Sequence, residues 1–262
     1  MIQKIVILGA GNLATQLALA LQENGIEILQ IYSRTEKSAK ALADQLHCEF
    51  TTSLRKLVPK ADLYIWALSD KALYPVLGEI LVPIGNVVHT AGSIPMDVFE
   101  NYARDYGVFY PLQTFSKDRK VDFTNIPICV EASEEYLQDE LLELGQRISN
   151  NVQLINTEQR KQLHLAAVFA CNFTNHMYSV GQALLKEKGM DFRLLHGLIS
   201  ETAHKALYLD PLMAQTGPAV RFDVEIMNLQ EEELKETPEF QKLYRFVSES
   251  ICHMHAAKKK LK

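Results

Sequence analysis

The sequence is poor in cysteine and has no excess of positive charge. Its 262 residues include four cysteines, which lie far apart and form no Cys-x-x-Cys pair: Cys48, Cys129, Cys171 and Cys252. This usage predicts free thiols in a reducing compartment and not a disulfide framework. The net charge of −5 gives no support to a nucleic-acid-binding surface. The basic tail at 258–262 is typical of a solvated chain end.

Long apolar runs are also lacking. No apolar stretch approaches the ~20 residues that span a bilayer, and the first predicted strand begins at residue 2 or 3, which leaves no room for a signal peptide. We therefore expect a cytoplasmic protein. Apolar residues make up 47% of the chain, which is enough to bury a substantial core in one large or two ordinary domains.

Strand and helix patterns alternate over the first 155 residues. Strands are predicted at 2–8, 27–32, 62–68, 86–90, 108–110 and 126–131, and helices at 13–22, 36–46, 72–81 and 134–148. This alternation predicts an α/β fold with a doubly wound parallel sheet. Asp70 is expected to cap the helix at 72–81, and Ser133 the helix at 134–148.

The pattern changes near residue 155. Strand signals stop, and helices are predicted at 157–186, 191–208, 219–229 and 238–257. We therefore predict two domains, an α/β domain over 1–155 and an all-α domain over 156–262. The helix at 157–186 is apolar on most faces, which predicts that it is buried between layers.

A glycine-rich turn follows the first predicted strand. Residues 9–14 read GAGNLA, a G-x-G-x-x-A pattern in which Gly9 permits a tight turn, Gly11 admits a pyrophosphate and Ala14 packs on the sheet. The N–H groups of the helix that follows would face the anion. The cofactor-binding candidates here are Gly9, Ala10, Gly11, Asn12 and Leu13. The alternative is a glycine turn that binds nothing.

The second predicted strand ends in a cation where an acid is common. An Asp or Glu at this place would bind the ribose 2′-hydroxyl of NAD and repel the 2′-phosphate of NADP. Here Tyr32 is followed by Ser33, Arg34 and Thr35. A guanidinium and two hydroxyls can bind a phosphate, which favours NADP over NAD. The alternative is an exposed loop arginine with helix capping by Ser33 or Thr35, and Glu36 is the acid that opposes the NADP interpretation.

Two further strand ends supply candidates. Ligands in open α/β sheets lie beyond the carboxyl ends of the strands, so we expect the backbone of Ala67, Leu68 and Ser69 to pass near the cofactor. His89 ends the strand at 86–90, where a nicotinamide would lie, and its reference pKa of ~6.5 suits proton donation. Ser93 follows as a substrate-binding candidate. The alternative for His89 is a histidine bonded inside a loop.

Polar residues after the next strand and on the helix at 157–186 complete the candidate site. Gln113 and Thr114 follow a proline turn and are substrate-binding candidates, with ordinary packing as the alternative. His164 and Asn172 lie on one helical stripe, together with Val168 and His176, which either lines a cleft between the domains or forms a core hydrogen-bond network.

One arginine of the helical half is a further candidate. Arg221 could bind an anionic substrate or form a structural ion pair with Asp223 or Glu225. No set of His, Cys, Asp and Glu residues has a convincing third ligand, so we predict no metal site.

These motifs together resemble a known family. GAGNLA at 9–14, SRT at 33–35, HTAGS at 89–93, PLQTF at 111–115 and GPAVR at 217–221 occur in this order. The pattern resembles Rossmann-like proteins with a C-terminal domain of unknown function, often labelled deazaflavin-coenzyme-dependent NADP oxidoreductases. It is more distantly similar to pyrroline-5-carboxylate reductase and the 6-phosphogluconate dehydrogenase-like superfamily. The resemblance implies an N-terminal NAD(P) domain, a helical C-terminal domain and a homodimer packed through its helices.

One departure from the distant relatives matters. The β-hydroxyacid dehydrogenases place a catalytic lysine one helical turn before an asparagine. Asn172 matches the asparagine, whereas Val168 takes the place of the lysine and cannot transfer a proton. If the chain is catalytic, His89 first, or else His164, would have to transfer the proton, with Asn172 holding the polar atom of the substrate. The alternative is a reaction that needs no such group.

Two functional hypotheses follow. The first is an NADP-dependent oxidoreductase that transfers a hydride between nicotinamide and a small carbonyl or imine substrate in a cleft between the domains. The second is a non-catalytic NADP-binding sensor or scaffold that dimerises through its helices. The expected partners are a small molecule and a second copy of the chain, with no nucleic acid and no membrane.

Overall fold

The computed structural model describes residues 1–80 and 84–260, which form two compact units, Met1–Asn172 and Phe173–Lys262. The change between these units falls after the predicted domain boundary at 155. Helix α5 (Thr157–Ala167) therefore belongs with the first unit, although its pattern groups it with the later helices.

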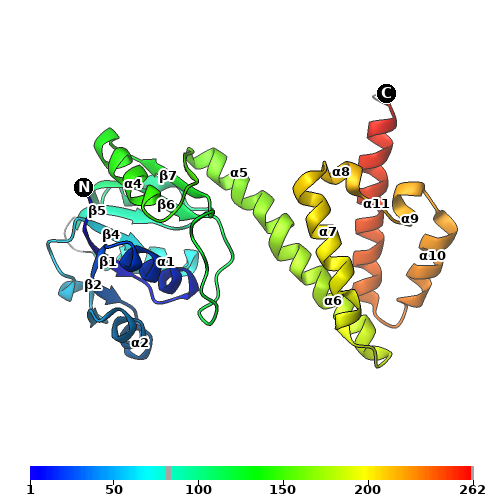
Figure 1. The fold of residues 1–262 in the computed structure, drawn as a ribbon, viewed down its shortest axis with the longest axis horizontal. Helices are drawn as coiled ribbons and strands as arrows, with labels where there is room; N and C mark the ends of the chain where they lie inside the picture. Colours follow the sequence, from blue (N-terminus) through cyan, green and yellow to red (C-terminus); the bar gives the residue numbers. More distant parts are fainter. Residues whose placement is uncertain (81–83, 261–262) are drawn as a thin grey trace. The chain divides into compact units, whose positions relative to one another are not determined.

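An eight-stranded sheet forms the centre of the first unit (Figure 1). The strands are β1 (Lys4–Leu8), β2 (Glu27–Tyr32), β3 (Glu49–Thr51), β4 (Leu63–Trp66), β5 (Ile84–His89), β6 (Ala103–Pro111), β7 (Ile128–Ala132) and β8 (Val152–Leu154). Their order is β3-β2-β1-β4-β5-β6-β7-β8. All neighbours are parallel except β6 and β7. The predicted α/β fold with a mostly parallel sheet is confirmed.

Helices cover both faces of this sheet. The apolar faces of α1 (Asn12–Glu23), α2 (Glu36–Leu46) and α4 (Glu135–Gln146) pack on one side. Helix α3 (Asp70–Leu77) and the 3-10 turn at Met96–Phe99 pack on the other. Burial from both faces explains why β1 and β4 read as unbroken apolar runs. The predicted helix at 72–81 ends at Leu77, and residue 81 lies outside the described residues.

Both predicted helix caps are wrong. Helix α4 has Glu134 at its N-cap, while the Ser133 hydroxyl accepts a hydrogen bond from the Tyr106 amide at 3.1 Å. Helix α3 has Ser69 at its N-cap, and the Asp70 carboxylate accepts a hydrogen bond from the Ser93 hydroxyl. In each case a partner distant in sequence takes the side chain that local rules assign to the helix end.

The second unit is helical. It contains α6 (Thr174–Glu187), α7 (His196–Tyr208), α8 (Pro211–Ala214), α9 (Pro218–Arg221), α10 (Val224–Glu233) and α11 (Pro238–Lys260). The single helix predicted at 219–229 is broken into α9 and α10, because Phe222 adopts a left-handed conformation with φ 57°. The side chain of Asp223 then caps α10 by accepting a hydrogen bond from the Ile226 amide at 3.3 Å.

The helix predicted at 157–186 is continuous but not uniform. A π-helical segment, Val168–Phe173, separates α5 from α6. The prediction that this helix is buried is wrong for the single chain, since Leu165 is 52% exposed and Phe169 62% exposed. Across the described part of the chain, no helix combines the length and hydropathy needed to cross a membrane.

Candidate active site

The glycine turn joins β1 to α1 at the point where the order of the sheet reverses. Gly9 has φ 132°, and a Cβ atom there would lie 2.2 Å from the carbonyl oxygen of Ala67 at the end of β4. Its amide donates to the carbonyl of Tyr32 at the end of β2, at 2.8 Å. Only glycine satisfies both the backbone angle and the close approach. The turn is therefore fixed between the ends of the two strands that flank β1.

The start of α1 is open. Gly11 is the N-cap residue of α1, and no described side chain forms a capping hydrogen bond there. A Cβ atom added to Gly11 would meet no atom within 4 Å. Ala14 is fully buried, as its predicted packing role requires, and Leu13 packs partly against the core. First-turn N–H groups with room in front of them are suited to an anionic pyrophosphate. The residues present therefore fit a dinucleotide.

Arg34 lies exposed just beyond the end of β2. No hydrogen bond or ion pair joins its guanidinium to another side chain in the residues that the structure describes. Thr35 is the N-cap residue of α2, but its hydroxyl donates to the Ser38 hydroxyl at 2.9 Å and does not cap the backbone. The Ser33 amide donates to the carbonyl of Thr51 at 3.2 Å. The cation is thus available to a phosphate next to the glycine turn, with Glu36 exposed beside it.

The predicted backbone contacts at the end of β4 lie beside the same turn. The Ala67 amide donates to the carbonyl of Leu8 at 2.8 Å, and the Ala67 carbonyl is the atom that approaches Gly9. Leu68 is half-buried, and Ser69 is exposed at the N-cap of α3. All three positions are at the carboxyl edge of the sheet, where a ligand of an open α/β fold lies.

His89 is enclosed in the loop that follows β5. The ring is fully buried; its Nδ1 accepts from the Ala91 amide at 3.1 Å, and its Nε2 lies 3.3 Å from the carbonyl oxygen of Pro95. Burial, with a smaller contribution from the positive charge of Arg160, lowers the pKa of His89 to about 3. A neutral ring with both nitrogens occupied does not present a proton to a ligand. The geometry favours the alternative interpretation, a histidine bonded inside a loop.

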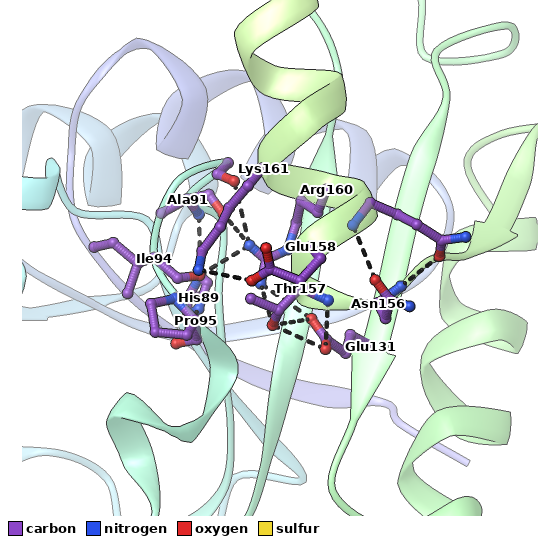
Figure 2. Close-up of polar contacts among 12 residues, drawn as sticks. His89, Ala91, Ile94, Pro95, Glu131, Asn156, Thr157, Glu158, Arg160 and Lys161 are labelled. Carbon is purple, nitrogen blue, oxygen red and sulfur yellow. Dashed lines mark hydrogen bonds and ion pairs between the residues drawn. The ribbon is translucent and has the colours of Figure 1, made fainter.

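A buried arginine holds this loop against α5 (Figure 2). Arg160 is fully buried, and its Nη1 donates to the carbonyl oxygens of Ala91, Gly92 and Ile94 at 3.3, 3.3 and 2.8 Å. Its Nη2 donates to Glu131 of β7 at 3.0 Å. Burial lowers the pKa of Arg160 although Glu131 opposes the shift. Removing one member of such a pair typically costs about 3–5 kcal/mol, so this contact fixes the loop.

Thr157 completes the attachment of α5 to the sheet. Its amide and hydroxyl both donate to the Glu131 carboxylate, at 2.8 and 2.9 Å. One residue earlier, Asn156 and Gln159 form a reciprocal capping box at the helix start. The start of α5 is therefore held both by its own cap and by β7.

A pocket of about 650 Å³ lies between the end of β6 and α5. It gathers four predicted residues, His164, Asn172, Gln113 and Thr114. The Gln113 side-chain oxygen accepts from the Thr114 amide at 2.8 Å. Val168, at the place of the lysine in the distant relatives, lines the same pocket. His164, Val168 and Asn172 of the stripe line this pocket within the first unit. The predicted cleft between the domains stays a prediction.

The pocket is connected to both neighbouring loops. His164 lies against Gly92, where an added Cβ atom would be 2.5 Å from the Cγ and Nδ1 atoms of the ring. The Asn12 side chain, at the start of α1, donates to the carbonyl of Phe115 at 3.0 Å, one residue after Thr114. The glycine turn, the loop after β5 and the pocket are thus parts of one connected edge of the sheet.

Two predicted substrate residues are not among those that line this pocket. Ser93 is exposed, does not line the pocket, and donates to Asp70. Arg221 is exposed in the second unit, and no salt bridge joins it to Asp223, Glu225 or another carboxylate in the described part of the chain. The ion pair expected for Arg221 is therefore not formed.

Sequence reasoning missed three residues of this edge. Tyr110 lies one residue before the end of β6 and lines the pocket, and the strand-end rule that selected Gln113 could have found it. Arg160 and Glu131 had no such signal, because a charged residue near a helix start or in a strand is more often solvated than buried. Only the tertiary structure brings these two together.

Comparisons with known proteins agree with this description. A family described as NADP oxidoreductase, coenzyme F420-dependent, matches residues 4–88, and a domain of unknown function, DUF2520, matches residues 126–251. A search of curated proteins found no significant match. The boundaries of these matches coincide neither with the predicted domains nor with the two compact units.

Solved structures extend the comparison. A Bacteroides fragilis protein provisionally assigned as an NADP oxidoreductase is 48% identical over 96% of this chain and 98% of its own, with a TM-score of 0.91. A 1-pyrroline-5-carboxylate reductase from Streptococcus pyogenes is 15% identical over 95% and 98%, with a TM-score of 0.63. An imine reductase from Myxococcus stipitatus in complex with NADP+ is 14% identical over 98% and 94%, with a TM-score of 0.59. The last two likenesses show the fold alone.

Proposed function

Because this chain belongs to the family that joins a coenzyme-F420-dependent NADP oxidoreductase domain to a DUF2520 domain, we propose that it transfers a hydride between NADP and a small carbonyl or imine substrate. The observation that carries this proposal is the continuous sheet edge that joins the glycine turn to the pocket. An oxidoreductase needs its cofactor and its substrate side by side, and this edge provides one place for each.

The glycine turn and Arg34 support NADP as the cofactor. The open start of α1 is suited to the pyrophosphate. Arg34, Ser33 and Thr35 lie one strand away, where the 2′-phosphate of NADP would need a cation and hydroxyl donors. When bound, the nicotinamide supplies or accepts the hydride. Nothing on this edge identifies a deazaflavin site, so the proposal includes no deazaflavin step.

His164 is the proposed proton-transfer residue in place of His89. Its ring lines the pocket and contacts the loop after β5, whereas His89 is enclosed. Asn172 would hold the polar atom of the substrate, and Gln113 and Thr114 would bind its other polar groups. Val168 and the neighbouring alanines of α5 would contact the apolar part.

A homodimer is the proposed assembly, because the second unit has almost no core of its own. Within its described residues only Ala219 and Ser248 are buried. Large apolar side chains are exposed instead, among them Leu194, Leu198, Leu207, Tyr208, Leu229 and Phe246. The described surface of the first unit exposes fewer such side chains, so another copy of the second unit is the surface we propose to cover this one.

Transfer of deuteride from 4-deuterated NADPH to matched ketones and cyclic imines tests the proposal. Product deuteration followed by mass spectrometry should be detected with the wild type and fall about 100-fold or more in His164→Gln, while NADP affinity stays unchanged in that variant. His47→Asn, at the exposed C-cap of α2 and not among the residues lining the pocket, is the control and should retain activity. Tight NADP binding with no transfer to any substrate of the panel would contradict catalysis and favour the sensor hypothesis.

A further inference from the structure

Tyr110 and His164 meet on the wall of the pocket. The Tyr110 Oη atom lies 3.1 Å from Nδ1 of His164, and the two rings pack edge to face with their centroids 6.1 Å apart. Tyr110 comes from the end of β6 and His164 from the second half of α5. The contact therefore joins the sheet to the helix at the place where a substrate would bind.

The environment of Tyr110 indicates which atom donates in this hydrogen bond. Tyr110 is 8% exposed, and burial raises its pKa to about 12, so the hydroxyl keeps its proton at neutral pH. A buried hydroxyl requires an acceptor, and Nδ1 of His164 is the one that the structure provides. An accepting Nδ1 carries no proton, so the neutral imidazole carries its proton on Nε2.

The orientation of the His164 ring is also restricted on its other side. The backbone of Gly92 lies so close to the ring that no Cβ atom would fit there. The carbonyl oxygen of Gly92 is one of the three that Arg160 holds. A displacement of the ring would therefore require the loop after β5 to move as well.

Building on the proposed function, we propose that Tyr110 is a positioning residue that holds His164 as the Nε2–H tautomer, with this N–H as the donor to the carbonyl oxygen or imine nitrogen of the substrate. As the substrate carbon takes up a hydride with its electron pair, its oxygen or nitrogen takes the Nε2 proton. The hydroxyl proton of Tyr110 moves to Nδ1 as Nε2 loses its own. After product release, solvent reprotonates Nε2 and Nδ1 returns its proton to the phenolate, which restores the Nε2–H tautomer. One hydride and one proton are consumed in total. The positive charge of Arg160 favours the transient phenolate.

The tautomer itself is the first test, and it needs no substrate. Full-length protein labelled with 15N-histidine gives separate NMR signals for Nδ1 and Nε2, and the His164 signals are identified by their loss in His164→Gln. The proton should be on Nε2 in the wild type, and Tyr110→Phe should produce a mixture of tautomers. Tyr64→Phe is the control, because Tyr64 is also buried and donates to the carbonyl of Val58 at 2.6 Å, away from the pocket. A wild-type proton on Nδ1, or a tautomer unaffected by Tyr110→Phe, would overturn the proposal.

Kinetics give the second test. Tyr110→Phe should lower kcat roughly 10-fold to 100-fold with KM changed by less than about threefold, whereas Tyr64→Phe should change neither. His164→Gln should lower kcat further, and the double variant should be no slower than His164→Gln alone, because Tyr110 acts through His164. A kcat within twofold of the wild type in Tyr110→Phe would overturn the proposal. Absence of turnover in the wild type would instead refute the proposed function, and the NMR result would still decide the tautomer.

Discussion

The two units of this protein differ most in what they bury. The first unit, Met1–Asn172, encloses its sheet between apolar helix faces on both sides. The second, Phe173–Lys262, is built of helices over its described residues but leaves many of its large apolar side chains exposed. Both sequences are rich in apolar residues with helical spacing. The difference shows that amphipathic patterning predicts a helix without identifying the surface that covers it.

The largest effect is expected when a charge is placed on the exposed apolar surface of the second unit. Leu198→Glu in α7, or Phe246→Glu in α11, places a charge on a side chain that is 64% or 73% exposed in the single chain. If a second copy covers these helices, either variant should lose the dimer and lower the thermal midpoint, because an unpaired charge is costly in an apolar interface. Light scattering and thermal unfolding measure both.

The matched control is Leu154→Glu on β8 of the first unit, where Leu154 is 48% exposed. It should keep the dimer and the midpoint of the wild type. A monomeric wild type, or helical-unit variants that remain dimeric with unchanged midpoints, would contradict the proposed covering of the second unit.

The next largest effects are expected at two glycines of the turn after β1, one required for stability and one for cofactor binding. Gly9→Ala would put a Cβ atom 2.2 Å from the Ala67 carbonyl at a φ of 132°, and we expect it to lower the free energy of unfolding by roughly 3 kcal/mol or more. Gly11→Ala meets open space and should leave that free energy unchanged, yet weaken NADP binding about 10-fold or more. Urea unfolding and calorimetric titration separate the two variants. If Gly9→Ala and Gly11→Ala change the free energy of unfolding and the NADP affinity equally, the two glycines do not have separate structural and binding roles.

A smaller effect follows from the buried ring of His89. Its pKa of about 3 in the folded chain lies below the ~6.5 of an unfolded histidine, so the unfolded state binds more protons below pH 6.5. The contribution of His89 to the free energy of unfolding is at its full value above pH 6.5 and decreases as the pH falls. Between pH 7 and pH 4.5 the wild type should lose on the order of 2–3 kcal/mol more than His89→Asn.

Urea unfolding at the two pH values checks this prediction. The control is His47→Asn, because His47 is exposed in a left-handed conformation that asparagine tolerates. It should keep the pH dependence of the wild type. If the free energy of unfolding depends on pH in the same way in His89→Asn as in the wild type, burial of His89 does not cause that pH dependence.

The parts of the fold that follow local rules could be predicted from the sequence. The central strands, the glycine turn and α1 were predicted because their patterns are local, and the family matches confirmed the resemblance that these motifs suggested. The three-residue strands β3 and β8 were missed, since so short a segment has no periodicity of its own. The break between α9 and α10 was missed because it depends on one left-handed residue, Phe222.

The candidate site could be predicted from the sequence only where its residues follow a local pattern such as the end of a strand. Strand-end reasoning selected Gln113 and Thr114, which line the pocket, and their binding of substrate stays a prediction. It ranked His89 above His164, because a sequence does not show which histidine is enclosed by its own loop. The hydrogen bond between Tyr110 and His164, and the contacts of Arg160 with three carbonyl oxygens, join segments far apart in the chain, so only the folded structure shows them.

The most direct test of this account is whether the full-length protein prefers NADPH or NADH, since the glycine turn and Arg34 of its first unit are proposed to bind the coenzyme. Calorimetric titration should show that the wild type binds NADPH more tightly than NADH, and that Arg34→Asp reverses this order, because the carboxylate repels the 2′-phosphate and can accept the 2′-hydroxyl. Lys60→Asp, exposed before β4 at the opposite edge of the sheet, should keep the wild-type order. An unchanged order in Arg34→Asp, or a wild type with no affinity for either coenzyme, would contradict the account.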